Sequence, residues 1–134
     1  MKKLLLIPLL ALCACSSKYY EVTYASDFTP YVKEGFHIYP EGTDIKTKNY
    51  IPLANISVSF HVGKPSKNMK VEDGLIQSEI TNNLTPTGEY MMKKIVNEAK
   101  SYGADAIINF KVEAINHKGL LTQFVASGTA VTIE

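Results

Sequence analysis

The clearest alternation of hydrophobic and polar positions along the chain lies over residues 51–62. A period of two residues is typical of a β-strand that buries one of its faces. Asparagine, serine and histidine occupy the polar positions, and the apolar positions are Ile56, Val58, Phe60 and Val62. Pro52 cannot donate a ladder hydrogen bond, so it suits only the beginning of such a strand. We therefore predict a half-buried strand over residues 51–62.

A helical period follows over residues 85–102. Apolar residues recur there at three- and four-residue spacing and form one stripe, which consists of Met92, Ile95, Val96 and Ala99. Thr85 is a residue type that caps helix N-termini, and Pro86 suits the first turn. Gly103, directly after the stripe, is placed for a left-handed C-terminal cap. The pattern predicts one principal helix from about residue 85 to residue 102.

A second period-two alternation begins shortly after this helix. Polar side chains separate the apolar residues Ala106, Ile108, Phe110 and Val112, which we expect on one face of a strand. The sequence His117-Lys118-Gly119 then predicts a tight turn, and residues 120–133 predict a last strand. These signals together predict an antiparallel hairpin with the helix packed on it.

Shorter signals fill the remainder of the chain. Aromatic and β-branched residues over 19–25 and 35–40 predict two further strands, the second of which stops at a proline. Residues 75–83 fit a helix or a strand equally. Polar composition predicts turns or loops over residues 26–30, 41–49 and 63–74. The predicted fold class is α+β: a small antiparallel-rich sheet with one principal helix, about 85–102, packed on it.

The first residues are typical of a secretion signal. Lys2 and Lys3 precede the apolar run 4–12, whose nine residues are too short for a membrane span of about twenty. The sequence Leu12-Cys13-Ala14-Cys15 resembles the bacterial lipobox, in which the cysteine is acylated and becomes the first mature residue. Cys13 is the poorer candidate, because bulky Leu12 would stand directly before the cut.

These residues divide the chain into three parts. We expect a lipoprotein signal peptide over residues 1–14, a tether over 15–19 that carries lipid on Cys15, and a single α+β domain over 20–134. Several acyl chains give stable anchoring, so the protein would sit on a membrane without crossing it. The alternative is an ordinary cleaved signal that contains two incidental cysteines.

Composition excludes two classes of function. Without Lys2 and Lys3, the 14 basic and 13 acidic side chains become 12 and 13, and all the basic ones are lysine. A nucleic-acid partner would require a basic surface and usually arginine, so we expect none. Both cysteines lie at the signal, so the mature domain would contain no disulfide and no free thiol, even in an oxidising periplasm.

Two segments resemble a known family. Residues 98–110, with Gly103-Ala104-Asp105 at their centre, look like the helix-to-strand junction of the YbjQ-like family. Residues 124–131 resemble that family's closing strand, and they contain its motif Gly128-Thr129-Ala130-Val131. The resemblance covers roughly residues 50–134. It implies a small α+β fold, a tendency to assemble into rings such as pentamers, and a name that refers to heavy-metal binding.

The residues that carry the resemblance also have a structural explanation. Gly103 can cap the helix, and small Ala104 lets the following strand pass close to it. Asp105 can accept backbone hydrogen bonds in the turn. Gly128 and Ala130 leave room for a packed neighbour, which is either the helix or another subunit. Motifs built of glycine, alanine and threonine specify backbone shape more than chemistry.

Candidate chemistry is sparse in this sequence. The histidines His37, His61 and His117 are far apart along the chain, and a zinc or copper site needs several nitrogen or sulfur ligands together. The sequence contains no nucleophile elbow, Walker loop or dinucleotide fingerprint. We therefore predict no catalytic residue, no metal ligand and no cofactor.

The leading functional hypothesis is a membrane-anchored envelope lipoprotein with a non-enzymatic, homo-oligomeric domain. The absence of an acidic run after Cys15 favours the outer membrane with the domain facing the periplasm. One alternative is a metal- or small-ligand-binding envelope protein that uses His61 or His37 with nearby carboxylates. Another is an enzyme without a recognisable motif, acting on envelope glycans.

Overall fold

Of the 134-residue chain, the computed structural model describes residues 21, 23–43, 45 and 49–134. The predicted signal peptide 1–14 and the tether 15–19 with Cys15 lie outside these residues. Within the described part of the chain, no helix is long and apolar enough to cross a bilayer.

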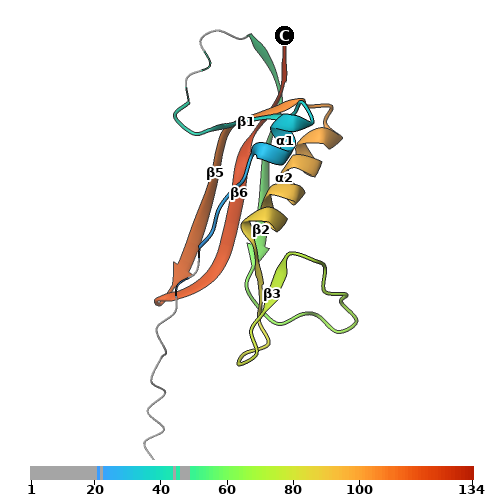
Figure 1. Cartoon of the computed structure of the whole chain (residues 1–134). Coiled ribbons are helices and arrows are strands. Elements are labelled where there is room, and N and C mark those ends of the chain that lie inside the picture. Colours follow the sequence, from blue (N-terminus) through green and yellow to red (C-terminus); the bar gives the residue numbers. More distant parts are fainter. Residues whose placement is uncertain (1–20, 22, 44, 46–48) are drawn as a thin grey trace, which may run out of the picture.

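One helix lies across one face of a four-stranded sheet (Figure 1). The sheet has the strand order β1-β5-β6-β2; β6 runs antiparallel to β5 and β2, whereas β1 pairs with β5 in parallel. A separate two-stranded ladder joins β3 and β4. The elements are α1 (Thr29–Lys33), β1 (His37–Pro40), β2 (Tyr50–His61), β3 (Leu75–Gln77), β4 (Leu84–Pro86), α2 (Gly88–Ser101), β5 (Ala106–His117) and β6 (Leu120–Ile133). The predicted α+β class with one principal helix is confirmed.

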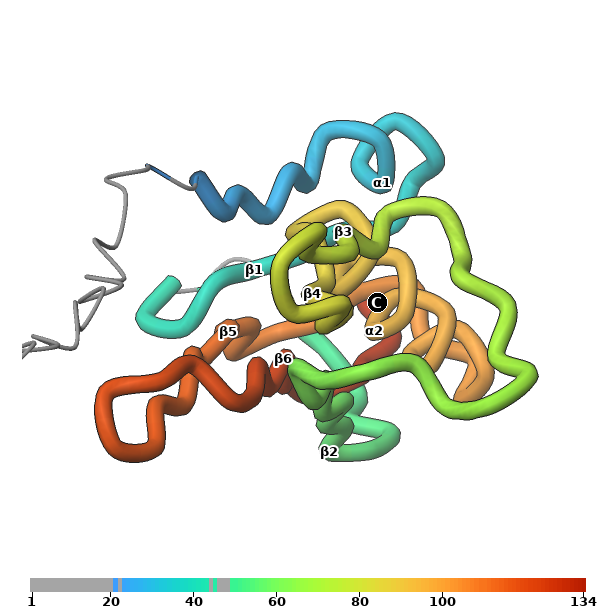
Figure 2. The backbone as a smooth tube through the Cα atoms, turned by 90° about the horizontal axis from the view of Figure 1, so that it is seen from below, coloured from blue at the N-terminus to red at the C-terminus, as the bar shows by residue number. Residues whose placement is uncertain are grey.

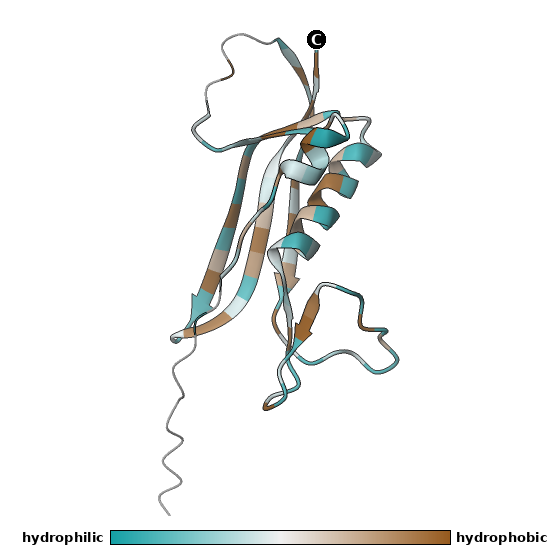
Figure 3. Ribbon diagram, viewed as in Figure 1, coloured by the Kyte–Doolittle hydropathy of each residue, from teal (hydrophilic) through white to brown (hydrophobic). Residues whose placement is uncertain are grey.

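The main core lies between α2 and the sheet. The predicted helical stripe is confirmed, because its four residues are all buried there. Apolar and polar bands follow one another along α2 in Figure 3, as expected for a helix with one face on a core. The sheet contributes buried side chains from β1, β2, β5 and β6, which are Ile38, Ile56, Ile107, Phe110, Ala126 and Ala130.

The predicted start of the helix is wrong by three residues. Thr87, not Thr85, is the N-cap: its Oγ1 accepts the N–H of Tyr90 at 3.2 Å and donates to the carbonyl of Gly74 at 2.7 Å. Thr85 and Pro86 belong to β4 instead, because they pair with β3. Because of this pairing, the helix begins later in the chain than predicted. The ambiguous segment 75–83 forms β3 and a turn.

The strand after the helix does not keep one hydrophobic face. Ile107 and Phe110 point to the α2 side, whereas Ala106 and Ile108 belong to a small cluster on the opposite face of the sheet. The register shifts between Ile108 and Lys111, and Asn109 within this bulge has a φ of +53°. A bulge adds one residue and so reverses the alternation. The prediction that Ala106 and Ile108 share a face with Phe110 is therefore wrong.

The predicted turn between β5 and β6 is confirmed. Lys118 and Gly119 both have positive φ values, +51° and +78°. Two consecutive residues of this kind form the type of two-residue hairpin turn whose twist matches that of the strands.

The N-terminal segment packs on the core, and the described residues of the strand predicted over 19–25 are not in a strand. Of that strand, the described residues 21 and 23–25 are irregular, and α1 follows where a turn was expected. The Tyr24 ring lies 5.0 Å from that of Phe124, and Phe28 contacts Phe110 edge to face at 5.5 Å. Figure 2 shows that residues 23–28 and α1 lie on the α2 side of the sheet. The aromatic residues are therefore held by packing and not by a strand ladder.

Gly88, the first residue of α2, permits the close crossing of this N-terminal segment. A Cβ atom at Gly88 would overlap the carbonyl group of Ala25. We predict that Gly88→Ala lowers the free energy of unfolding by about 1–3 kcal/mol, as overpacked sites do. Urea denaturation measures this change. Gly63→Ala is the matched control, because a Cβ there meets no atom within 4 Å, and we expect a change within about 0.5 kcal/mol. Equal stability of the two variants would contradict the close crossing.

Candidate functional site

The junction between α2 and β5 holds β1, β5 and β6 together at one end of the sheet. Gly103 has a φ of +80°, and Gly103 and Ala104 donate backbone hydrogen bonds to Lys100 and Ala99, the pattern of a Schellman cap. This cap places Asp105 at the beginning of the sheet.

Asp105 binds the backbone of both neighbouring strands. Its N–H donates to the carbonyl of Val131 at 3.1 Å, and its own carbonyl accepts the N–H of His37 at 3.1 Å. Its carboxylate Oδ1 accepts the N–H of Ile133 at 2.9 Å. The expectation that Asp105 accepts backbone hydrogen bonds is confirmed, although the donors lie in β1 and β6 and not in the turn. The motif residue thus has a structural role.

The second motif fits the bulge of β5. A Cβ atom at Gly128 would come within 2.5 Å of Ile107 Cγ2 and 3.0 Å of the Ile108 carbonyl oxygen. Ala130 is fully buried in the core beneath α2. The room left by Gly128 is therefore taken by the adjacent strand, and the room left by Ala130 by the helix core. Thr129 makes a different contact: its Oγ1 donates to Asn55 Oδ1 of β2 at 2.8 Å.

The histidines are not assembled into a metal site. His37, half-buried at the start of β1, stacks on Tyr39 with ring centroids 6.2 Å apart. His61 and His117 are exposed at the ends of β2 and β5, which β6 separates. Among the described residues, no three histidine, cysteine, aspartate or glutamate side chains lie close enough to hold a metal ion. The predicted lipid site, Cys15, lies outside the described residues.

An acidic cavity of about 420 Å³ lies between α1 and α2. Burial raises the pKa of Tyr31 in its wall, and the carboxylates of Glu89 and Glu34 add to this effect. Asp27 nearby accepts the backbone N–H of Thr29 at 2.9 Å, and this hydrogen bond lowers its pKa. The phenol of Tyr31 therefore stays protonated and can donate a hydrogen bond, but it is a poor nucleophile. The other cavity walls come from Ala25, Pro30 and Met92.

A smaller apolar cavity of about 180 Å³ lies between the end of β2, the loop 63–74 and α2. It is smaller than the 300–1,000 Å³ typical of ligand pockets. Glu72 and Lys94 hold the loop against the helix with an ion pair of 3.0 Å, which lowers the pKa of Glu72 and raises that of Lys94. The residues that line this cavity are Phe60, His61, Gly63, Lys64, Met69, Leu75, Leu84, Pro86 and Tyr90.

The outer edge of β2 is the least protected backbone of the sheet. Within the described part of the chain, β2 has a strand partner only on its β6 side, apart from the bridge just beyond its end. Pro52 and the register shift at Leu53 interrupt the start of β2, but residues 54–61 contain no charged side chain and no proline, which are devices that usually protect an edge strand. Ile51 and Leu53 at its start are exposed to 48% and 39%. The opposite edge strand, β1, has only four residues and ends in a proline.

Comparison with known proteins identifies the class to which this α+β domain belongs. The sequence profile of the YbjQ family, described as "Putative heavy-metal-binding", matches residues 66–134. A UPF0145 protein of Pyrococcus furiosus is 32% identical over 86 residues, which span 63% of this chain and 75% of that protein. The chain belongs to the YbjQ family. The predicted resemblance is confirmed.

A solved structure from Pediococcus pentosaceus, a protein of unknown function of the DUF74 family, is similar with a TM-score of 0.41 and 18% identity. The similarity covers 75% of this chain and 99% of that one. The family profile matches the part of this chain that contains α2, β5 and β6, and therefore both motifs.

The contribution of the Asp105 carboxylate hydrogen bond to stability can be separated from the effect of side-chain size. We predict that Asp105→Ala lowers the free energy of unfolding by about 1–3 kcal/mol, because the N–H of Ile133 loses its acceptor. Asp105→Asn keeps a carbonyl oxygen there and should recover part of this loss. Urea denaturation gives the stability, and hydrogen exchange reports the amide of Ile133, which should exchange faster in the alanine variant. An unchanged exchange rate would refute this role.

Proposed function

We propose that the protein is an envelope lipoprotein, anchored by lipid on Cys15, whose domain is a non-enzymatic module that assembles into a homo-oligomer. The sequence Leu12-Cys13-Ala14-Cys15 supports the anchor. The unprotected edge of β2 is the observation that carries the assembly. The lack of an acidic residue in Ser16-Ser17-Lys18 supports an outer membrane location with the domain facing the periplasm.

The β2 edge supports assembly for a physical reason. An edge strand offers a row of free N–H and C=O groups, which another chain can pair with. Natural proteins usually block this pairing unless they use it, and residues 54–61 contain neither a charged side chain nor a proline nor a register shift. The exposed apolar side chains of Ile51 and Leu53 would add buried surface to such a contact. If all copies are anchored to the same membrane, a second copy of the domain is always available as a partner.

The non-enzymatic part of the proposal rests on the contacts of the family motifs. Asp105, Gly128 and Thr129 are each explained by a backbone or inter-strand contact. The cavities described above are small or walled by exposed carboxylates. A metal-binding role is the second candidate, favoured by the description of the family. In this second candidate we expect ligands from different copies to share a metal ion, so that assembly requires metal.

The assembly has a direct test. We predict that light scattering of residues 18–134 gives a discrete oligomer whose mass is the same with and without added zinc, copper or nickel. Ser57→Lys with Ser59→Lys adds like charges to the exposed face of β2 and should shift the mass towards the monomer. Asn97→Lys with Tyr102→Lys adds the same charge on α2 and should leave it unchanged.

Two outcomes would oppose this assembly. A monomer at every attainable concentration would rule out the homo-oligomer. An oligomer that forms only after metal is added would favour the metal-binding candidate, and it would direct mutagenesis to His37, His61 and His117.

The anchor has a test of its own. We predict that the chain, expressed with its signal in a bacterium, has a mature mass that corresponds to residues 15–134 plus acyl chains and is found in the membrane fraction. Cys15→Ser should abolish acylation, whereas Cys13→Ser is the matched control and should be processed normally. Mass spectrometry of the two variants decides the site. Acylation that survives Cys15→Ser would contradict the assignment, and so would a cleaved protein without lipid.

A further inference from the structure

The direction of the N-terminal segment shows at which end the described chain begins. Phe28 contacts Phe110 in the upper half of β5, and Tyr24 contacts Phe124. Phe124 pairs with Ala114, which lies closer to the β5–β6 turn than Phe110 does. Followed backwards from Phe28 to Tyr24, the chain therefore runs towards that turn, as Figure 1 shows. The described residues begin at this end of the domain.

The length of the preceding chain limits how far this end can lie from a membrane. If Cys15 carries the lipid, Glu21 is the sixth residue after it. A fully extended chain spans at most about 3.3–3.6 Å per residue, so the reach is about 20 Å. The anchor of the proposed function would thus hold this end of the domain within about 20 Å of the bilayer surface. The opposite end, where α2 finishes, lies farther away (Figure 1).

Three connections lie at this end of the domain, which we name the turn end: residues 63–71, 78–83 and 117–120. The β2 residue His61 pairs with Gln123, which also pairs with Ile115 near the β5–β6 turn. The loop 63–74 therefore starts here. The bridge between Gly63 and Leu84 brings the β3–β4 connection to the same place.

Large apolar side chains are exposed on each of the three connections. Ile80 is exposed to 94%, and Leu120 to 71%; Met69 is exposed as well. Figure 3 shows a hydrophobic residue at the tip of the β3–β4 turn, the lowest part of the described chain in that view. Ile80 and Leu120 are the two most exposed large apolar side chains of the described residues, and both lie at this end. Exposed apolar surface of this kind is typical of sites that contact a partner or a membrane.

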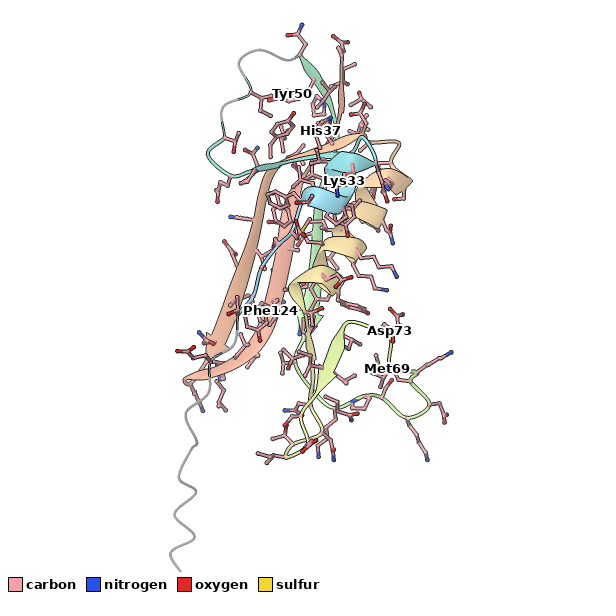
Figure 4. All side chains as sticks on the ribbon, viewed as in Figure 1. Lys33, His37, Tyr50, Met69, Asp73 and Phe124 are labelled. Carbon is pink, nitrogen blue, oxygen red and sulfur yellow. The ribbon has the colours of Figure 1, made fainter. Side chains whose placement is uncertain are left out.

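Lysines lie on two of the three connections, 63–71 and 117–120. The exposed lysines of the turn end are Lys64, Lys67, Lys70 and Lys118. The acidic side chains near these connections include Glu72 and Glu79, and Glu72 forms an ion pair with Lys94 of α2. In Figure 4, Asp73 lies on the α2 side of the loop, above Met69. Lysine can bury its aliphatic stem and keep its ammonium group at the level of lipid headgroups.

We propose that the turn end docks on the surface of an anionic bilayer, with Ile80, Leu120 and Met69 in the interface and the lysines at the headgroups. The proposal rests on the lipid anchor of the proposed function. Juxtamembrane lysines are attracted to anionic lipids, and apolar side chains add interfacial burial. The acyl chains then fix the position of the domain, and the turn end fixes its orientation.

The test uses the full acylated chain in vesicles of phosphatidylethanolamine and phosphatidylglycerol. The mature chain has no cysteine other than Cys15. Single-cysteine variants Ile80→Cys and Leu120→Cys can therefore be labelled with bimane, and lipids with a nitroxide near the headgroup quench a label in the interface. We expect a loss of fluorescence at both positions. Tyr102→Cys is the matched control, because it is exposed at the far end of α2 and should stay bright.

The lysines are tested in the same vesicles. Lys64→Gln, Lys67→Gln and Lys70→Gln together should reduce the quenching at Ile80→Cys. Substitution of Lys33, Lys93 and Lys100 by glutamine gives the same net charge as the first triple variant. This control should not reduce the quenching at Ile80→Cys. The difference between the two triple variants should disappear when phosphatidylcholine replaces the anionic lipid.

The outcomes separate this inference from the proposed function. A chain without acyl groups in mass spectrometry refutes the anchor. An acylated chain whose labels at positions 80 and 120 are as bright as the label at position 102 refutes the docking alone. Equal quenching at all three positions also refutes it, because the domain would then have no fixed orientation. Equal quenching of the two triple variants in anionic vesicles would show that the lysines do not contribute.

Discussion

The rest of the structure depends on the close junction at which α2 ends and β5 begins. Gly103 turns the chain within a single residue, and Asp105 then binds both neighbouring strands through backbone and carboxylate. These contacts fix where β5 starts between β1 and β6. The position of β5 sets where its bulge falls, and Gly128 is the only kind of residue that lets β6 pass Ile107 there. Helix, bulge and closing strand therefore form one geometric unit.

Local periodicity predicted the elements that local physics controls. The alternation over residues 51–62 and the stripe of the helix are confirmed, because each reflects burial of one face along a regular element. The helix start was mispredicted because Thr85 is engaged by β3, a contact distant in sequence. The two faces of β5 were mispredicted because Asn109 tolerates a positive φ, and one extra residue reverses the alternation. The motif residues were recognised, but the partners of Gly128 and Asp105 were not visible in sequence.

Membership of the YbjQ family explains backbone shape in this chain more directly than it explains metal chemistry. The matched region contains the cap, the junction and the closing strand. His61 and His117 within the described residues stand on strands separated by β6, and His37 packs on Tyr39. Among the described residues, no three possible ligands lie together.

The two proposed surfaces constrain one another. β2 and β5 both run antiparallel to β6, so they point in the same direction, towards the turn end. Antiparallel pairing of two β2 edges would turn one copy upside down and lift its turn end from the bilayer. Copies that share one membrane orientation must instead pair β2 with a different edge. One such edge is the part of β5 after Phe110, because β1 pairs with β5 only as far as Phe110. Such head-to-tail contacts generate rings when the rotation closes, with the axis along the membrane normal. A membrane-docked turn end and an open β2 edge therefore favour a cyclic assembly over a two-fold dimer.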